Sequence, residues 1–179
     1  MNERTKLAEA RYFYDRMLAE FDNRENFTYN LSAFLAAARS VLLYAREEAQ
    51  NKSGGQQWYD GWISGSRILS FFRDKRNVNI HFGPVKPVQH IEVTVTDGVC
   101  LSDSVQVDHR DKDGKVLYES PLEASQPKPS KPEPPTSVKT EYRFADWSGK
   151  EDLMTLSNMY LEELRQLIED GIHRSFISG

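Results

Sequence analysis

A nine-residue segment near the middle of the chain, residues 73 to 81, has the order Arg-Asp-Lys-Arg-Asn-Val-Asn-Ile-His. Within it Arg76 and His81 are separated by four residues, and Asn77 directly follows the arginine. A histidine with a pKa of about 6.5 can accept or donate a proton at neutral pH. An arginine presents a planar fork of donors that matches a phosphate. These residue types could therefore combine acid–base chemistry with the binding of an anion.

The same segment lies in the most basic part of an otherwise acidic chain. The net charge of the 179 residues is -4, yet residues 67 to 86 contain five Lys and Arg against one acid. Such a patch could attract phosphate, and Arg73 and Lys75 are the candidates for binding a substrate. The competing interpretation is a solvated helix end, where cations offset the negative end of the helix dipole.

Apolar residues recur with helical period in four segments, which predict helices over residues 4–22, 25–50, 56–80 and 149–176. The last of these should begin at a capping box formed by Ser148 and Glu151. Small residues between 32 and 40 would allow a neighbouring helix to approach closely, either in an antiparallel bundle or in a dimer. The aromatic cluster between residues 56 and 75 is expected to be core.

Between the third and fourth of these segments the pattern changes from helical to alternating, which predicts strands around 91–95, 105–107, 116–118 and 140–144. Asp97-Gly98 and the segment 111–114 are expected to be turns. Residues 121–136 hold six of the eight prolines, which is typical of an extended connector. A proline-rich ligand for an aromatic groove is the alternative.

The predicted fold is thus mainly α, a four-helix up-down bundle with an antiparallel β insertion before the last helix. We expect residues 1–87 to form the first three helices, residues 88–147 the insertion with its proline-rich linker, and residues 148–179 the closing helix.

Composition excludes several classes of protein. The mean hydropathy is -0.64 and no apolar run is long enough to cross a membrane, so we expect a cytoplasmic protein without a membrane partner. The single cysteine, Cys100, cannot form an internal disulfide. No two histidines have the spacing of metal ligands, and no glycine-rich phosphate loop is present, so we expect neither a metal nor a cofactor. Gly61 and Gly65 are expected to permit close packing inside a helix.

The segment Arg76, Asn77 and His81 resembles the signature of the HEPN family. That signature is an arginine, usually followed by a polar residue, and a histidine four to six positions later at the end of a helix in a small bundle. The resemblance covers the motif and the helical context of residues 4–82 and 149–176. The strand-rich stretch 88–145 would be an insertion into the basic HEPN bundle.

The resemblance implies cleavage of RNA without a metal ion, in which the ribose 2′-hydroxyl attacks the adjacent phosphate. His81 would carry the proton, Arg76 would hold the charge that develops on phosphorus, and Asn77 would orient the phosphate or the imidazole. One arginine and one histidine supply few groups for two proton transfers. The family's solution is a composite site at a two-fold dimer, which implies a homodimer.

Two functions of different class remain open from the sequence. The first is an HEPN-like endoribonuclease of the toxin or defence type, for which an antitoxin or another protein could be a partner. The second is a catalytically inactive HEPN-like helical dimer that binds a protein. The acidity of the chain disfavours RNA affinity, because that affinity scales with the number of phosphates neutralised.

Overall fold

The computed structural model describes residues 2–81, 85, 87–94, 108–110, 116–119 and 137–179. For residues 76–81 it describes the helical backbone alone. The helices of the described residues are α1 (Asn2–Ala19), α2 (Arg24–Ala49), α3 (Gly55–Gly65), α4 (Arg67–His81) and α5 (Leu153–His173). The mainly helical fold predicted from the sequence is therefore confirmed.

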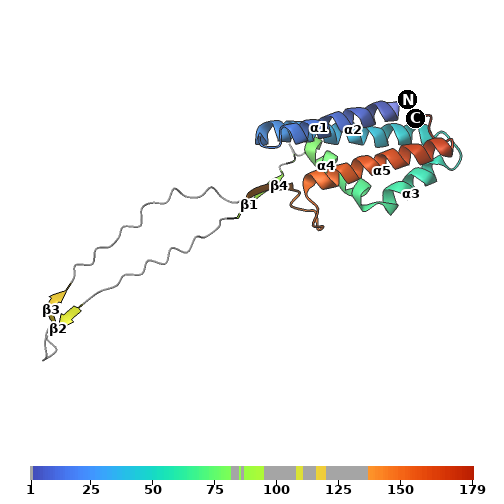
Figure 1. Cartoon of the computed structure of the whole chain (residues 1–179). Coiled ribbons are helices and arrows are strands. Elements are labelled where there is room, and N and C mark those ends of the chain that lie inside the picture. Colours follow the sequence, from blue (N-terminus) through green and yellow to red (C-terminus); the bar gives the residue numbers. More distant parts are fainter. Residues whose placement is uncertain (1, 82–84, 86, 95–107, 111–115, 120–136) are drawn as a thin grey trace. The chain divides into compact units, whose positions relative to one another are not determined.

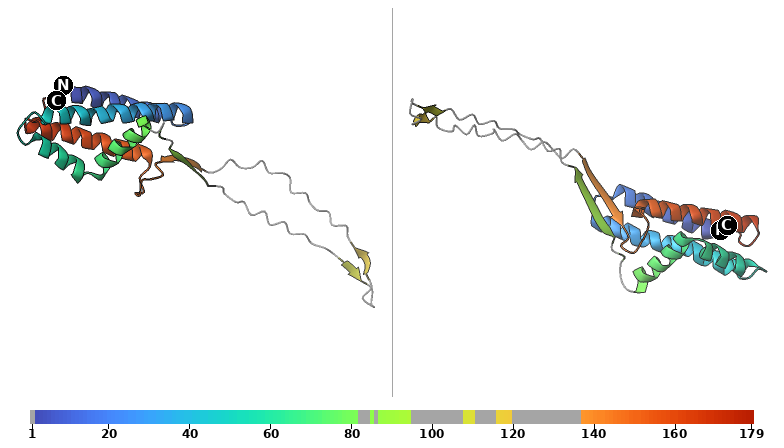
Figure 2. Two further views of the ribbon diagram at one scale, coloured as in Figure 1. Left: turned by 180° about the vertical axis from the view of Figure 1, so that it is seen from behind. Right: turned by 90° about the horizontal axis from the view of Figure 1, so that it is seen from below.

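The helices form a bundle whose fourth side is made of two shorter pieces. Figure 1 shows α1, α2 and α5 running lengthwise, with α3 and α4 following one another along the remaining side. The views in Figure 2 agree with this arrangement. Residues near the two ends of the chain also lie close together: a Cβ built on Gly179 would be 3.3 Å from Nε of Arg4.

The prediction of a single helix over 56–80 is wrong, because the helical backbone is interrupted at Ser66. This residue has extended backbone angles, φ -111° and ψ 118°, and its N–H still donates to the carbonyl of Trp62. Its Oγ accepts the N–H of Leu69 over 2.9 Å, which is the bond of a helix N-cap. Ser66 therefore ends α3 and begins α4 at the same position, and α4 can take a new direction.

Side-chain caps determine where α2 and α5, the two longest of the described helices, begin. Asn23 accepts the N–H of Asn26 over 3.1 Å and starts α2 close to the predicted position. The capping box predicted at Ser148 is wrong: Asp152 caps α5 and accepts the N–H of Thr155 over 2.9 Å. Glu151 instead accepts the indole N–H of Trp147 over 2.8 Å. Asp152 is the better placed cap because Leu153, the first apolar residue of the helix, follows it directly.

The described residues between α4 and α5 contain the short strands β1 (Val88–Thr94), β2 (Asp108–Arg110), β3 (Val116–Glu119) and β4 (Ser137–Arg143). β1 pairs with β4, and β2 pairs with β3 in antiparallel register with a bulge after His109. The chain forms two compact units, one of residues 1–90 and 141–179 and one of residues 91–140. The strand predicted at 105–107, the turns at 97–98 and 111–114, and the proline-rich segment 121–136 lie outside the described residues.

The core of the bundle explains how α4 is held. Phe72 of α4 stacks on Tyr160 of α5, with ring centroids 4.3 Å apart and planes 3° apart. Phe144, which follows β4, contacts Phe71 and Phe72 edge-on at 5.3 and 5.8 Å. Both Phe72 and Tyr160 are buried, so this aromatic contact fixes the middle of α4 against α5.

Most apolar residues of the predicted helices are buried, with two informative exceptions. Leu18, an apolar residue of the first predicted helix (4–22), is 49% exposed. Among the small residues of α2, Ala37 is buried but Ala36 is exposed. Helix packing inside the bundle therefore uses only part of the small-residue segment.

Candidate functional site

The predicted catalytic residues lie at the C-terminal end of α4. Arg76, Asn77 and His81 belong to the last six residues of this helix, which ends at His81. With a rise of about 1.5 Å per residue, Arg76 and His81 are about 7.5 Å apart along the helix axis. The turn of about 100° per residue places them about 140° apart around it. The roles assigned to these three residues stay predictions, because the structure describes their backbone alone.

The two predicted substrate-binding cations lie on α4 just before the motif, Arg73 three residues and Lys75 one residue ahead of Arg76, and both have acidic neighbours. Nε of Arg73 is 3.1 Å from Oδ1 of Asp74, on an exposed surface. Lys75 forms an ion pair with Asp146, and its side chain is only 12% exposed. The ammonium of Lys75 thus already has a counterion, whereas Arg73 is the more accessible of the two.

Lys75 also contributes to the packing of α4. Its Nζ lies 5.2 Å from the ring centroids of both Phe71 and Phe144. A cation at this distance from two ring faces is attracted by their quadrupoles, and the methylene stem covers apolar surface. Lys75 therefore anchors the helix that carries the motif, whatever its part in substrate binding.

A groove that the sequence analysis did not anticipate lies between α3 and α5. Its volume is about 900 Å³, and we call it the tryptophan groove because all three tryptophans of the chain line it: Trp58, Trp62 and Trp147. Gly61 and Gly65 also line it, and a Cβ at either would meet nothing within 4 Å. These two glycines leave one wall open and do not permit close packing, so the role predicted for them is wrong.

The groove was not predicted from the sequence, because the whole aromatic cluster of residues 56–75 was expected to be core. Tyr59, Ile63 and Phe72 are indeed buried, but Trp58 and Trp62 are only partly so. The signal that could have separated them is spacing. Trp58 and Trp62 lie four residues apart, as do Gly61 and Gly65, so large rings and missing side chains share one side of a short helix.

A single carboxylate fixes one end of the groove. Oδ2 of Asp170 accepts the indole N–H of Trp58 over 2.6 Å and that of Trp62 over 3.0 Å. Its Oδ1 accepts Nε of Arg174 over 2.8 Å. Burial alone would raise the pKa of Asp170, but the hydrogen bonds from Arg174, Trp62 and Trp58 outweigh it and lower the pKa below 3.8. Asp170 is therefore a charged acceptor that holds two indoles in place.

The other end of the groove is built around the break between α3 and α4. Ser66 donates its hydroxyl to Glu163 of α5. Arg67, the first residue of α4, lies over the ring of Trp147 with its Cζ 4.3 Å from the centroid, and it donates to Oγ of Ser148. The indole N–H of Trp147 in turn holds Glu151 and lowers its pKa. Each carboxylate at this end thus has a donor.

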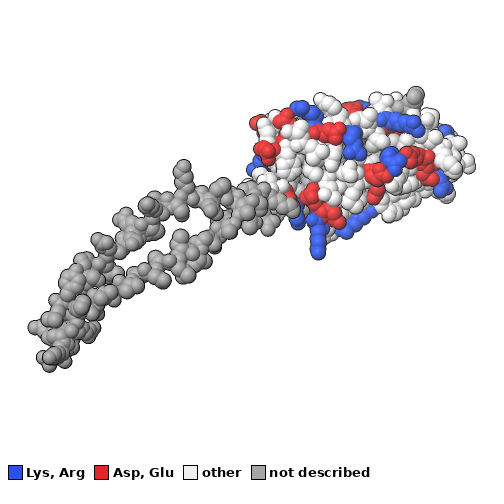
Figure 3. Space-filling model, viewed as in Figure 1, with Lys and Arg blue, Asp and Glu red and all other residues white. Residues whose placement is uncertain are grey.

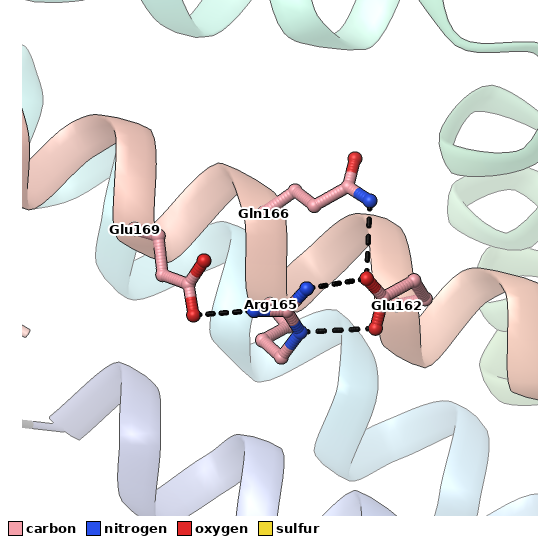
Figure 4. A network of polar contacts seen from close by, with 4 residues as sticks. All are labelled: Glu162, Arg165, Gln166 and Glu169. Carbon is pink, nitrogen blue, oxygen red and sulfur yellow. Dashed lines mark hydrogen bonds and ion pairs between the residues drawn. The ribbon is translucent and has the colours of Figure 1, made fainter.

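Charges of both signs are mixed on one face of the bundle, and several of the charged residues on α5 form ion pairs. On the face that Figure 3 shows, Lys and Arg side chains are interspersed with Asp and Glu. Figure 4 shows one such network on α5, in which Arg165 joins Glu162 and Glu169. Hydrogen bonds from Arg165 and Gln166 lower the pKa of Glu162 to about 2. Gln166 also lines the tryptophan groove, so this network borders it.

Two further properties bear on the class of protein. Within the described ranges, no three His, Cys, Asp or Glu side chains are grouped closely enough to hold a metal ion. None of the helices is both long and apolar enough to cross a membrane, as far as the described residues go.

Known proteins offer no match to this chain: no family model, no curated protein and no solved structure is similar to it. The resemblance to HEPN proteins therefore depends on Arg76, Asn77 and His81 and on their helical context.

Proposed function

We propose that this chain is an HEPN-like endoribonuclease that cleaves RNA without a metal ion, with Arg76, Asn77 and His81 as its catalytic residues. The supporting observation is that α4 ends at His81, so the motif closes a helix of a helical bundle. This is the context in which the HEPN motif occurs. We further propose that the enzyme is cytoplasmic and of the toxin or defence type, with an antitoxin or another protein as a partner.

The reaction needs groups that this segment contains. The 2′-hydroxyl of the substrate loses its proton and attacks the adjacent phosphorus, the bond from phosphorus to the 5′-oxygen breaks, and that oxygen takes a proton. The products are a 2′,3′-cyclic phosphate and a 5′-hydroxyl. His81 transfers a proton, which contributes roughly 10² to 10⁴ in rate. Arg76 stabilises the charge on the phosphorane. Asn77 holds the phosphate or the imidazole in position.

A second copy of the chain completes the site. One imidazole cannot remove a proton from the 2′-oxygen and donate another to the 5′-oxygen in the same step. A two-fold homodimer in which the ends of two α4 helices meet supplies a second histidine and a second arginine. Each motif then contributes one half of the acid–base pair.

The test compares purified wild type with Arg76→Ala, His81→Ala and Asn77→Ala on mixed single-stranded RNA in EDTA. We expect cleavage by wild type, no cleavage by the arginine and histidine variants, and slower cleavage by Asn77→Ala. Circular dichroism of each variant should match wild type, because the motif lies at a helix end. Cleavage that survives both Arg76→Ala and His81→Ala would remove these residues from the mechanism.

The second candidate is a catalytically inactive HEPN-like dimer that binds a protein. It is favoured by the net charge of -4 and by the mixture of signs on the face in Figure 3, since RNA binding gains from unpaired cations. Wild type that cleaves none of several RNAs, yet is a dimer, would support this candidate.

A further inference from the structure

The tryptophan groove presents ring faces to a ligand, and its indole donors are already used. Trp58 and Trp62 both donate to Asp170, and Trp147 donates to Glu151. A ligand that needs an indole N–H, such as a peptide carbonyl, would have to displace one of these charge-assisted bonds. Stacking on a ring needs no such exchange.

Trp62 is the ring best placed for stacking. Trp147 is covered by Arg67 and contacted by Phe71 at 4.8 Å, and Trp58 lies 5.4 Å from Phe176. Among the described residues Trp62 has no comparable contact with another ring. It stands beside the open positions of Gly61 and Gly65, where the wall of the groove has no side chains. Its bond to Asp170 fixes the orientation of the indole.

Two exposed guanidinium groups lie at opposite ends of the groove. Arg67 follows the C-terminal end of α3, whereas Arg174 lies by its N-terminal end, where Phe176 approaches Gly54. The ten residue steps of α3 correspond to about 15 Å. Each guanidinium uses only part of its donors within the chain, Arg67 on Ser148 and Arg174 on Asp170. The remaining donors can bind anions.

The two acids of the groove both accept hydrogen bonds from within the chain. Asp170 accepts three hydrogen bonds, one of them from Arg174, and Glu163 accepts the hydroxyl of Ser66. The groove thus combines an indole ring of fixed orientation with a guanidinium group at either end. This arrangement is complementary to a chain of flat rings joined by negative charges.

We propose that the tryptophan groove binds single-stranded nucleic acid, with one base stacked on Trp62 and flanking phosphates bound by Arg67 and Arg174. This binding does not require Arg76 or His81, so it can be present whether or not the chain cleaves RNA. If the chain is a nuclease, the groove holds part of the substrate away from the scissile bond. A proline-rich peptide is the competing occupant.

The test uses intrinsic fluorescence, because every tryptophan of the chain lines the groove. The probe is a thymidine octanucleotide of single-stranded DNA, which lacks the 2′-hydroxyl and cannot be cleaved by 2′-hydroxyl attack. We expect saturable quenching of wild-type fluorescence. The logarithm of the association constant should fall with the logarithm of salt concentration with a slope of about -1.4, as two phosphate contacts require.

Two variants of α3 separate occupancy of the groove from effects on folding. Gly61→Leu adds a side chain where a Cβ meets nothing, so it fills the groove without a clash. Ser64→Leu adds the same side chain at an exposed position that does not line the groove. We expect binding to be roughly 10- to 100-fold weaker in Gly61→Leu, by the loss of one stacked base, and unchanged in Ser64→Leu.

A double variant and a peptide titration distinguish nucleic acid from a proline-rich peptide as the ligand of the groove. The double variant Arg67→Gln, Arg174→Gln should bind the octanucleotide more weakly and lose most of the salt dependence. A synthetic peptide with the sequence of residues 126–135 serves as the proline-rich probe. Octanucleotide affinity that is equal in wild type and Gly61→Leu would overturn the proposal. Quenching by the peptide without quenching by the octanucleotide would overturn it in favour of a peptide site.

Discussion

The indole N–H of Trp62 donates to Oδ2 of Asp170 over 3.0 Å and joins α3 to the last turn of α5. The same oxygen accepts the indole of Trp58, while Arg174 binds the other oxygen. Both indole rings of α3 are therefore held by the same carboxylate of α5. This shared acceptor fixes the orientation of both indoles in the tryptophan groove.

Asp170→Asn should destabilise the bundle at neutral pH by about 1–3 kcal/mol, because the indoles and Arg174 lose a charged acceptor. The pKa of Asp170 is lowered in the folded protein, so its contribution is complete above 3.8 and is lost as the pH falls through the folded value. Urea unfolding of both proteins should therefore show a difference that shrinks in acid. Glu169→Gln is the control: this exposed carboxylate pairs with Arg165 on the surface of α5, so its loss should cost less than about 1 kcal/mol. Equal losses in the two variants would contradict the account.

Two glycine substitutions should change stability in opposite directions. Gly61→Ala should stabilise by roughly 0.5–1 kcal/mol, because the residue lies inside α3 and its Cβ meets open space. Gly171→Ala should destabilise, since its Cβ would lie 2.7 Å from Cη2 of Trp58 and 2.8 Å from Cγ1 of Ile177. Thermal melts of the two variants measure both signs, and a stable Gly171→Ala would mean that Trp58 is not fixed against α5.

Two buried tyrosines offer a matched pair. Tyr160 and Tyr142 are each 1% exposed and each stacks on a phenylalanine. The hydroxyl of Tyr142 donates to the carbonyl of Phe21 over 3.1 Å, whereas that of Tyr160 has no hydrogen-bond partner within the part of the chain that the structure describes. Tyr142→Phe should therefore cost about 0.5–1.5 kcal/mol, and Tyr160→Phe should be neutral or stabilising. Denaturant midpoints test the pair, and the reverse order would be incompatible with this packing.

The sequence predicted the helical elements well because their apolar periodicity is strong. Phe34, Leu35, Leu42 and Leu164 all face the core as expected. It failed where two local signals compete. Ser66 combines an extended backbone with an N-cap, which interrupts a periodic apolar pattern, and Asp152 caps α5 in place of Ser148.

The candidate sites show the same limit. The motif of Arg76 and His81 can be read from the sequence because its residues are close together, and its catalytic role stays a prediction. The tryptophan groove was missed, although the shared spacing of its tryptophans and glycines on one side of α3 is a partial signal. Aromatic residues at helical spacing usually indicate a core. The groove also depends on hydrogen bonds to Asp170, more than a hundred residues from Trp58 and Trp62, which no local pattern predicts.

The composite site predicts that cleavage depends on protein concentration. If a homodimer brings two copies of His81 together, activity per chain should fall on dilution below the dissociation constant of the dimer. Light scattering over the same range should show the dimer converting to monomer. A protein that stays monomeric at micromolar concentration and keeps constant specific activity would rule out the composite site.

The most direct test of the central claim is the chemistry of the RNA ends. Wild type and His81→Ala are incubated with a defined single-stranded RNA in EDTA, and the products are identified by mass spectrometry. If cleavage proceeds by 2′-hydroxyl attack with His81 as the proton carrier, we expect 2′,3′-cyclic phosphate and 5′-hydroxyl ends from wild type and intact RNA from His81→Ala. Products with a 5′-phosphate, or equal cleavage by the two proteins, would contradict it.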